Sequence, residues 1–242
     1  MDNLLGEFLG TMVLCAFGCG VVASTLLTGS KGQNGGWIVI TAGWGFAVVM
    51  GVYTAITCGA PQADLNPSVT LAKYFMGIYT SFGHVLATML AELAGGFVGG
   101  VICWLAYLGH WEKTEDQGFK LGIFCTGPAI RNTTNNFICE VIATFFLIFG
   151  IFCIFGKGVG GMAPGMGPYV VGILIWALGM SFGGPTGYAM NLARDLGPRL
   201  AHAVLPIAGK GGSDWGYAWI PCVAPLVGAS IAYVFGHAIG IM

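Results

Sequence analysis

Charged side chains are scarce in this chain: Asp, Glu, Lys and Arg together make up 8% of its 242 residues. Soluble domains usually carry about 25% charged residues. Hydrophobic residues account for 56% of the chain. Because so few charges cannot cover a folded surface in water, the composition excludes an ordinary soluble domain. It predicts an integral, multi-pass protein of a cell membrane.

Residue patterns typical of metal, disulfide or nucleic-acid sites are also missing. The eight cysteines show neither CxxC nor CxxH spacing, and the four histidines form no cluster. We therefore expect no metal site, no disulfide framework and no cofactor. The nine Lys and Arg residues are scattered singly and the formal net charge is −1. That distribution argues against a nucleic-acid partner.

Apolar runs that approach the length of a spanning helix, about 20 residues, occur six times. Two further segments, 66–79 and 191–205, read as helices too short to span, and they follow the second and fifth runs. No stretch between the runs resembles an interdomain linker, so we expect one transmembrane domain over residues 1–242. The six runs are roughly Leu4–Leu27, Trp37–Thr57, His84–Leu108, Phe137–Phe155, Gly167–Phe182 and Tyr217–Ile241.

The two short segments begin with similar sequences, Asn66-Pro-Ser and Asn191-Leu-Ala. Asn is a favoured N-cap, and Pro67 suits the first helical position. Half-helices at corresponding places in two chain halves indicate a solute site near the membrane midplane. Their positive dipole ends would meet there, and the Asn66 and Asn191 amides would donate to a passing oxygen. We expect the loops before them to turn carbonyl oxygens toward the lumen, because irregular backbone in a bilayer must line a watery cavity.

The chain halves resemble each other elsewhere too. Glu7-Phe-Leu-Gly-Thr matches Glu140-Val-Ile-Ala-Thr, and Ala91-Glu-Leu-Ala-Gly-Gly matches Ala224-Pro-Leu-Val-Gly-Ala. Each half, roughly 1–108 and 137–242, contributes three spanning helices. Since three is odd, the second half must enter the membrane from the opposite side. The sequence therefore predicts an inverted repeat in an all-α bundle of six transmembrane helices and two re-entrant half-helices.

With these features the sequence resembles the aquaporin family, and within it the glycerol facilitators. The family carries a paired Asn-Pro-Ala motif, to which Asn66-Pro67-Ser68 and Asn191-Leu192-Ala193 are similar. The Arg194-Asp195 pair that follows, and Pro225-Leu226 in the last run, are similar to the glycerol-conducting branch. Leu192 departs from the motif proline, and the loss of that rigid ring leaves the width and stiffness of the pore centre open.

The resemblance implies roles for further residues. It implies a selectivity filter of Trp44, Gly179, Tyr188 and Arg194, in which Gly179 leaves room for solute and Tyr188 replaces a common Phe. Buried carboxylates at Glu7 and Glu140 would hold the half-helix loops, and Asp195 would orient loop amides or an arginine. The resemblance also implies a homotetramer with both termini cytoplasmic. The distribution of Lys and Arg favours the opposite orientation.

The function expected is passive conduction of glycerol, other small neutral solutes and water, with exclusion of protons and ions. Arg194 would repel cations and grip solute hydroxyls. One alternative is a water-selective aquaporin. A second is a secondary transporter, which also uses inverted repeats and broken helices. An enzyme would need a nucleophile–base or metal-ligand constellation, and the sequence offers none, so we expect no enzymatic activity.

Overall fold

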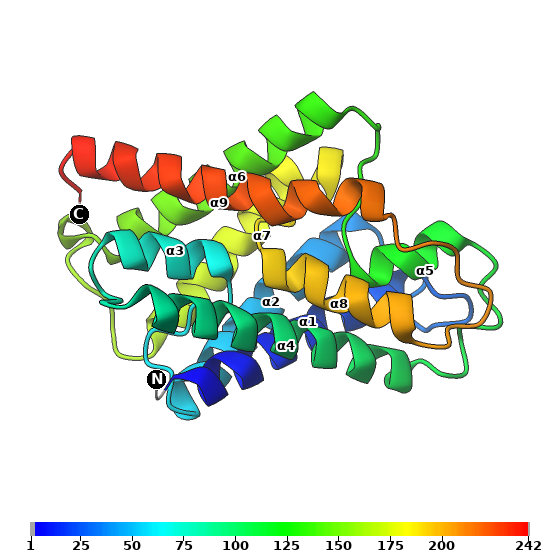
Figure 1. Ribbon diagram of the computed structural model, residues 1–242. Coiled ribbons are helices and arrows are strands. Elements are labelled where there is room, and N and C mark those ends of the chain that lie inside the picture. The colour runs from blue at the N-terminus through cyan, green and yellow to red at the C-terminus, as the bar shows by residue number, and fades with distance from the viewer. Residues whose placement is uncertain (1–2, 242) are drawn as a thin grey trace.

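The computed structural model describes residues 3–241, so residues 1, 2 and 242 of the 1–242 span lie outside the described part (Figure 1). Within it the chain forms nine α-helices and one short 3₁₀ turn, Lys157–Val159, and no strand. The helices are α1 (Leu4–Leu26), α2 (Trp37–Thr57), α3 (Pro67–Phe75), α4 (Phe82–Ala106), α5 (Gln117–Phe124), α6 (Thr133–Phe155), α7 (Met166–Thr186), α8 (Leu192–Val204) and α9 (Trp215–Ala238).

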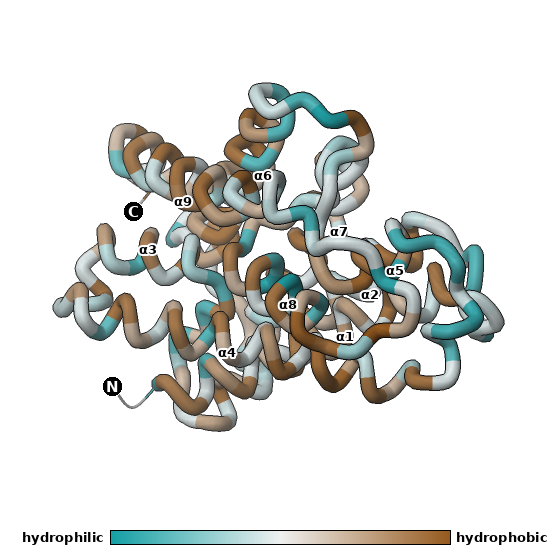
Figure 2. Tube along the Cα trace, turned by 45° about the vertical axis from the view of Figure 1, so that its right-hand side comes forward, coloured by the Kyte–Doolittle hydropathy of each residue, from teal (hydrophilic) through white to brown (hydrophobic). Residues whose placement is uncertain are grey.

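Six of these helices are long and apolar enough to cross a membrane, namely α1, α2, α4, α6, α7 and α9. Large apolar side chains remain exposed along their outer surfaces, among them Leu90 at 64% and Val234 at 64%. Hydrophilic residues gather instead in the loops around α5 (Figure 2). This distribution suits a lipid-facing bundle, and the protein is an integral, multi-pass membrane protein.

The two halves repeat one arrangement with opposite direction. In the first, α1 packs against α4 through Gly95, where an added Cβ would lie 2.2 Å from the Phe8 carbonyl oxygen. In the second, α6 packs against α9 through Gly228, where an added Cβ would lie 2.5 Å from the Val141 carbonyl oxygen. The half-helices α3 and α8 lie end to end across the middle with their N-termini meeting (Figure 1). The predicted all-α inverted repeat is confirmed.

Element bounds differ from the sequence-based expectation in several places. The half-helices begin one residue later than expected, because Asn66 and Asn191 are caps rather than first helical residues. The polar stretch 109–136 contains an unpredicted helix, α5, whose cap Asp116 accepts a hydrogen bond from the Phe119 amide at 2.9 Å. Its two glycines weaken the helical pattern, but buried Phe124 packs in the core. Tertiary contacts therefore stabilise a helix that local propensity does not predict.

Candidate functional site

The two asparagines stand at the tips of the half-helices with nearly identical backbone conformations. Asn66 has φ −156° and ψ 115°, and Asn191 has φ −157° and ψ 111°. The Oδ1 atom of Asn66 accepts from the Ser68 amide at 2.9 Å, whereas that of Asn191 accepts from the Arg194 amide at 3.1 Å. Each side-chain oxygen thus caps its own helix, so the NH₂ group faces away from it.

Each asparagine also binds the loop of the other half. The Asn66 Nδ2 atom donates to the Met190 carbonyl oxygen at 2.9 Å, and the Asn191 Nδ2 atom donates to the Leu65 carbonyl oxygen at 2.8 Å. An amide NH₂ carries two hydrogens. One hydrogen of each asparagine therefore fixes the junction between the halves, and the second has no partner among residues 3–241.

The loops that precede the asparagines are strained in the same pattern. Left-handed φ values occur at Ala63 (44°) and Leu65 (51°) in the first loop, and at Tyr188 (39°) and Met190 (49°) in the second. Residues other than glycine rarely adopt this region. The fifth apolar run was expected to end at Phe182, but α7 continues to Thr186, so the second loop is shorter than expected. Such strain persists only where surrounding contacts impose it.

Two buried carboxylates supply those contacts. The Glu7 side chain accepts from the amides of Asp64 at 3.0 Å and Leu65 at 2.9 Å. The Glu140 side chain accepts from the amides of Ala189 and Met190, both at 3.0 Å. Since N–H and C=O of a trans peptide point in opposite directions, the carbonyl groups of these peptides point away from the carboxylates. The loops therefore present acceptors on their other side.

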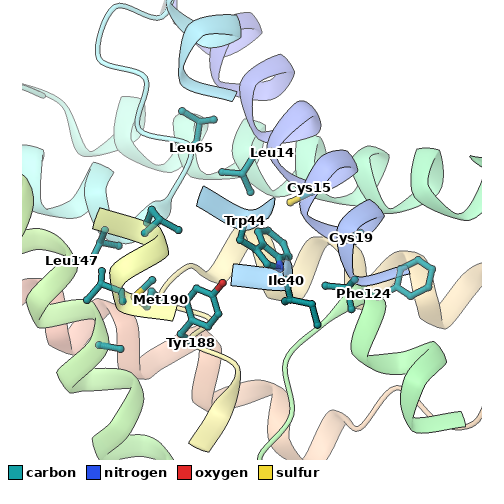
Figure 3. Packing of buried hydrophobic residues seen from close by; sticks show 14 of the residues in the cluster. Leu14, Cys15, Cys19, Ile40, Trp44, Leu65, Phe124, Leu147, Tyr188 and Met190 are labelled. Carbon is teal, nitrogen blue, oxygen red and sulfur yellow. The ribbon is translucent and has the colours of Figure 1, made fainter. Parts of the chain in front are cut away.

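Arg194, Trp44 and Tyr188 come together one helical turn beyond Asn191. The guanidinium carbon of Arg194 lies 4.0 Å from the centre of the Trp44 ring. The Tyr188 hydroxyl faces Ile40 and the Trp44 ring (Figure 3), and among the described residues it has no hydrogen-bond partner. Burial of the Tyr188 ring is nearly complete, at 3% exposed. The cluster brings together a cation, an aromatic wall and a buried hydroxyl that has no hydrogen-bond partner among the described residues.

Gly179 lies beside this cluster without bordering the space within it. An added Cβ at Gly179 would lie 2.7 Å from Tyr188 Cζ and 2.8 Å from its hydroxyl oxygen. The room that we expected Gly179 to leave for solute is therefore filled by Tyr188. A further contact, from the Trp37 indole nitrogen to the Gly179 carbonyl oxygen at 3.1 Å, holds α2 against α7 here. Gly179 therefore meets the cluster through its packing against Tyr188.

Asp195 and Arg199 anchor α8 behind Arg194. Asp195 accepts from the Thr126 amide at 2.7 Å and hydroxyl at 2.6 Å, and from Arg199 Nε at 2.9 Å. Arg199 also donates to the carbonyl oxygens of Thr126 at 2.9 Å and Ser213 at 2.8 Å. Both charged side chains are fully buried, and paired buried charges of this kind are costly to break. The half-helix is thereby fastened to the loops on either side.

The remaining motif residues lie behind the asparagines rather than beside the open space. Pro67 occupies the first turn of α3, and Ser68 is fully buried with no hydrogen-bond partner for its hydroxyl among the described residues. Ala193 is fully buried where α4 crosses α8, since a Cβ at Gly96 would lie 2.4 Å from the Ala193 carbonyl oxygen. Leu192 begins α8 and is partly buried.

A cavity of about 940 Å³ connects these groups. It extends from Trp44, Tyr188 and Arg194, past both asparagines, to Lys73, Lys157 and Ile241 at the end of the bundle where the described chain starts and finishes. Along its length the strained loops face an apolar wall. That wall includes Leu14, Val48, Val52, Leu147, Ile148, Ile151 and Ile175.

Comparison with known proteins agrees with this arrangement. The sequence pattern of the family described as Major intrinsic protein matches residues 1–235. The chain belongs to the major intrinsic protein family. It is 55% identical to glycerol uptake facilitator protein 3 of Lactiplantibacillus plantarum, across 95% of this chain and 93% of that protein. It is 42% identical to a D/L-lactic acid transporter of the same organism, across 98% and 97%.

The solved structures agree with the same assignment. An aquaglyceroporin from Plasmodium falciparum superposes with a TM-score of 0.82 at 29% identity, covering 97% of this chain and 94% of that one. The resemblance to the aquaporin family that the paired asparagine segments indicated is thus confirmed for this major intrinsic protein.

Sequence reasoning missed several residues of the site in this major intrinsic protein. Glu92, on α4, accepts from the Asn66 amide at 3.1 Å. Lys73 pairs with Asp64 and donates to the Gln62 carbonyl oxygen at 2.6 Å. A buried Glu within an apolar run was the available signal for Glu92, because intramembrane carboxylates are rare. Nothing in the sequence named its partners.

Proposed function

We propose that the protein is a passive channel for glycerol, other small neutral solutes and water. The observation that carries this proposal is the cavity itself, which joins both asparagines to Trp44, Tyr188 and Arg194. One wall is apolar and the opposite wall carries carbonyl acceptors and amide donors. A polyol has a carbon face and a hydroxyl face, so it matches both walls. The names of the relatives point to the same solute class.

Exclusion of cations and protons is part of the proposal. Two helix N-termini meet at the asparagines, and each carries about half a positive charge. Arg194 adds a full charge near one end of the cavity. Asn66 and Asn191 each keep one amide hydrogen free, and two donors on one water oxygen would interrupt a proton-conducting chain of water. Channels of this kind catalyse no reaction, and the protein is not an enzyme.

We also propose a homotetramer in the cell membrane, with the cavity mouth at Lys73 and Lys157 on the cytoplasmic side. Two of the basic residues that lie toward the other side are held inside the fold. Lys210 donates to the Ala203 and Leu205 carbonyl oxygens at the end of α8, and Arg199 is fully buried. Basic residues used inside the fold carry little weight in the positive-inside rule.

Stopped-flow light scattering on proteoliposomes tests the solute. A hyperosmotic glycerol jump should produce fast shrinkage by water efflux, followed by reswelling much faster than in protein-free vesicles. Shrinkage without accelerated reswelling would instead support the water-selective alternative. Accelerated lactic acid flux, tested in parallel because of the lactic acid relative, would widen the solute range without removing glycerol from it.

A further inference from the structure

Three carboxyl groups converge behind the first asparagine. Glu7 comes from α1, Asp64 from the first loop and Glu92 from α4, and the three side chains are almost completely buried. Among residues 3–241, Lys73 is the one cation paired with this group, through Asp64. The second half differs, because the repeat places Pro225 opposite Glu92 and Ala189 opposite Asp64. The first loop therefore carries a buried acidic group that its counterpart lacks.

Two of the three carboxyl groups, Glu7 and Asp64, have partners that stabilise a negative charge. Glu7 accepts two backbone amides. Asp64 pairs with Lys73 and accepts from the Tyr79 hydroxyl at 2.6 Å. Burial and the Asp64 charge raise the pKa of Tyr79 well above its ordinary value, so Tyr79 remains a donor. Asp64 thus has both a cation and a hydroxyl to stabilise its charge.

Thr70 requires one more hydrogen than its own hydroxyl supplies. Its Oγ1 atom lies 2.8 Å from Glu92 Oε1 and 3.0 Å from Asp64 Oδ2. A hydroxyl donates one hydrogen, so two ionised carboxylates at these distances would leave one contact with no hydrogen in it. One carboxyl group must therefore carry a proton. Since Lys73 pairs with Asp64, that proton belongs to Glu92.

The surroundings of Glu92 also favour its protonated form. Its second oxygen, Oε2, is buried and has no hydrogen-bond partner among the described residues, a placement far more costly for an ion than for a neutral acid. Glu7 and Glu92 accept from the consecutive amides of Leu65 and Asn66, so an ionised Glu92 would lie close to the Glu7 charge. The charged residues of α8 do not neutralise it, because Arg194 stacks on Trp44 and Arg199 pairs with Asp195.

We propose that Glu92 is a neutral carboxylic acid and a positioning residue for Asn66. Its Oε1 atom lies 3.1 Å from the Asn66 amide nitrogen and 2.8 Å from the Thr70 hydroxyl oxygen. With the proton on Oε1, this oxygen would accept from the Asn66 amide and donate to Thr70, which in turn would donate to Asp64. The bound proton thus links α4, α3 and the first loop at the point where the half-helices meet. Only the flux consequence of this inference rests on the proposed function, because the protonation state is measurable without transport.

Infrared spectroscopy tests the protonation state directly. In an ester-free detergent at neutral pH, wild type minus Glu92→Gln should show the carbonyl stretch of a protonated carboxylic acid. The matched control, Glu112→Gln, alters an exposed loop glutamate and should show only carboxylate bands. Carboxylate bands alone in the Glu92→Gln difference would overturn the proposal, whatever the transport rates.

Glycerol permeability of Glu92 variants tests whether Glu92 positions Asn66. Glu92→Gln keeps an acceptor for the Asn66 amide and should retain glycerol permeability within about twofold. Glu92→Leu has a similar size but leaves that buried amide unpartnered, so permeability should fall about fivefold or more. Wild-type permeability in Glu92→Leu would contradict the positioning role. If Glu92→Leu does not fold, Thr70→Val takes its place, with Thr70→Ser as its control. Unchanged glycerol flux in Thr70→Val would also contradict the positioning role.

Discussion

The guanidinium carbon of Arg194 lies 4.0 Å from the centre of the Trp44 ring, and both side chains are buried at one end of the cavity. A cation over a tryptophan face is attracted by the ring's negative face, by about 2 kcal/mol where water is excluded. The contact fixes the guanidinium against the ring, and we propose that its N–H groups bind solute hydroxyls. Under the proposed function, this contact holds a positive charge at the cavity lining, where it would repel cations.

Arg194→Val should remove this charge and widen the passage. We expect larger neutral solutes to permeate and cation or proton leak to rise in proteoliposomes, measured with an internal pH dye. Arg194→Lys keeps the charge without the planar fork, so it should restore cation exclusion but not the solute ranking. An unchanged solute ranking and an unchanged leak in Arg194→Val would contradict the role of Arg194.

Gly179→Ala should reduce glycerol permeability more than water permeability. The new methyl group would lie 2.7 Å from Tyr188 Cζ, so the Tyr188 ring must move, and the cavity begins beside it. Gly184→Ala on the same helix is the control, because an added Cβ there meets nothing within 4 Å. Equal ratios of glycerol to water permeability in the two variants would show that Gly179 does not affect selectivity.

The fold was largely predictable from the sequence, whereas the site was predictable only in outline. The apolar runs predicted the six spanning helices, and the repeated asparagine segments predicted both half-helices. The α5 helix escaped prediction because it depends on contacts of Phe124 with the core rather than on periodicity. Thr70 and Glu92 lie on different helices, and no local pattern pairs them. The occupation of the Gly179 space by Tyr188 is likewise a matter of packing.

Asp195→Asn should destabilise the protein strongly. The substitution removes a carboxylate oxygen that Arg199 needs and leaves a fully buried guanidinium without its charge partner. Breaking a buried pair costs about 3–5 kcal/mol. Thermal unfolding in detergent should show a large drop in the midpoint, compared with Asp116→Asn in the exposed α5 cap. Similar midpoints for the two variants would show that the Asp195–Arg199 pair contributes little.

Gly95→Ala should loosen the packing of α1 on α4. The added methyl group would lie 2.2 Å from the Phe8 carbonyl oxygen, and backbone atoms in packed helices cannot move aside cheaply. Overpacking of this kind costs about 1–3 kcal/mol. Gly83→Ala, at the start of α4, meets only the Ser81 hydroxyl at 3.6 Å and should unfold like the wild type. Equal thermal midpoints for Gly95→Ala and the wild type would contradict this packing role.

The most direct test of the account is the dependence of glycerol flux on glycerol concentration, recorded with internal pH in the same proteoliposomes. A passive pore predicts that the rate rises linearly without saturating, with no proton movement and no response to an imposed pH gradient or membrane potential. Saturation at low concentration, or flux driven by a gradient, would contradict it and favour a secondary transporter.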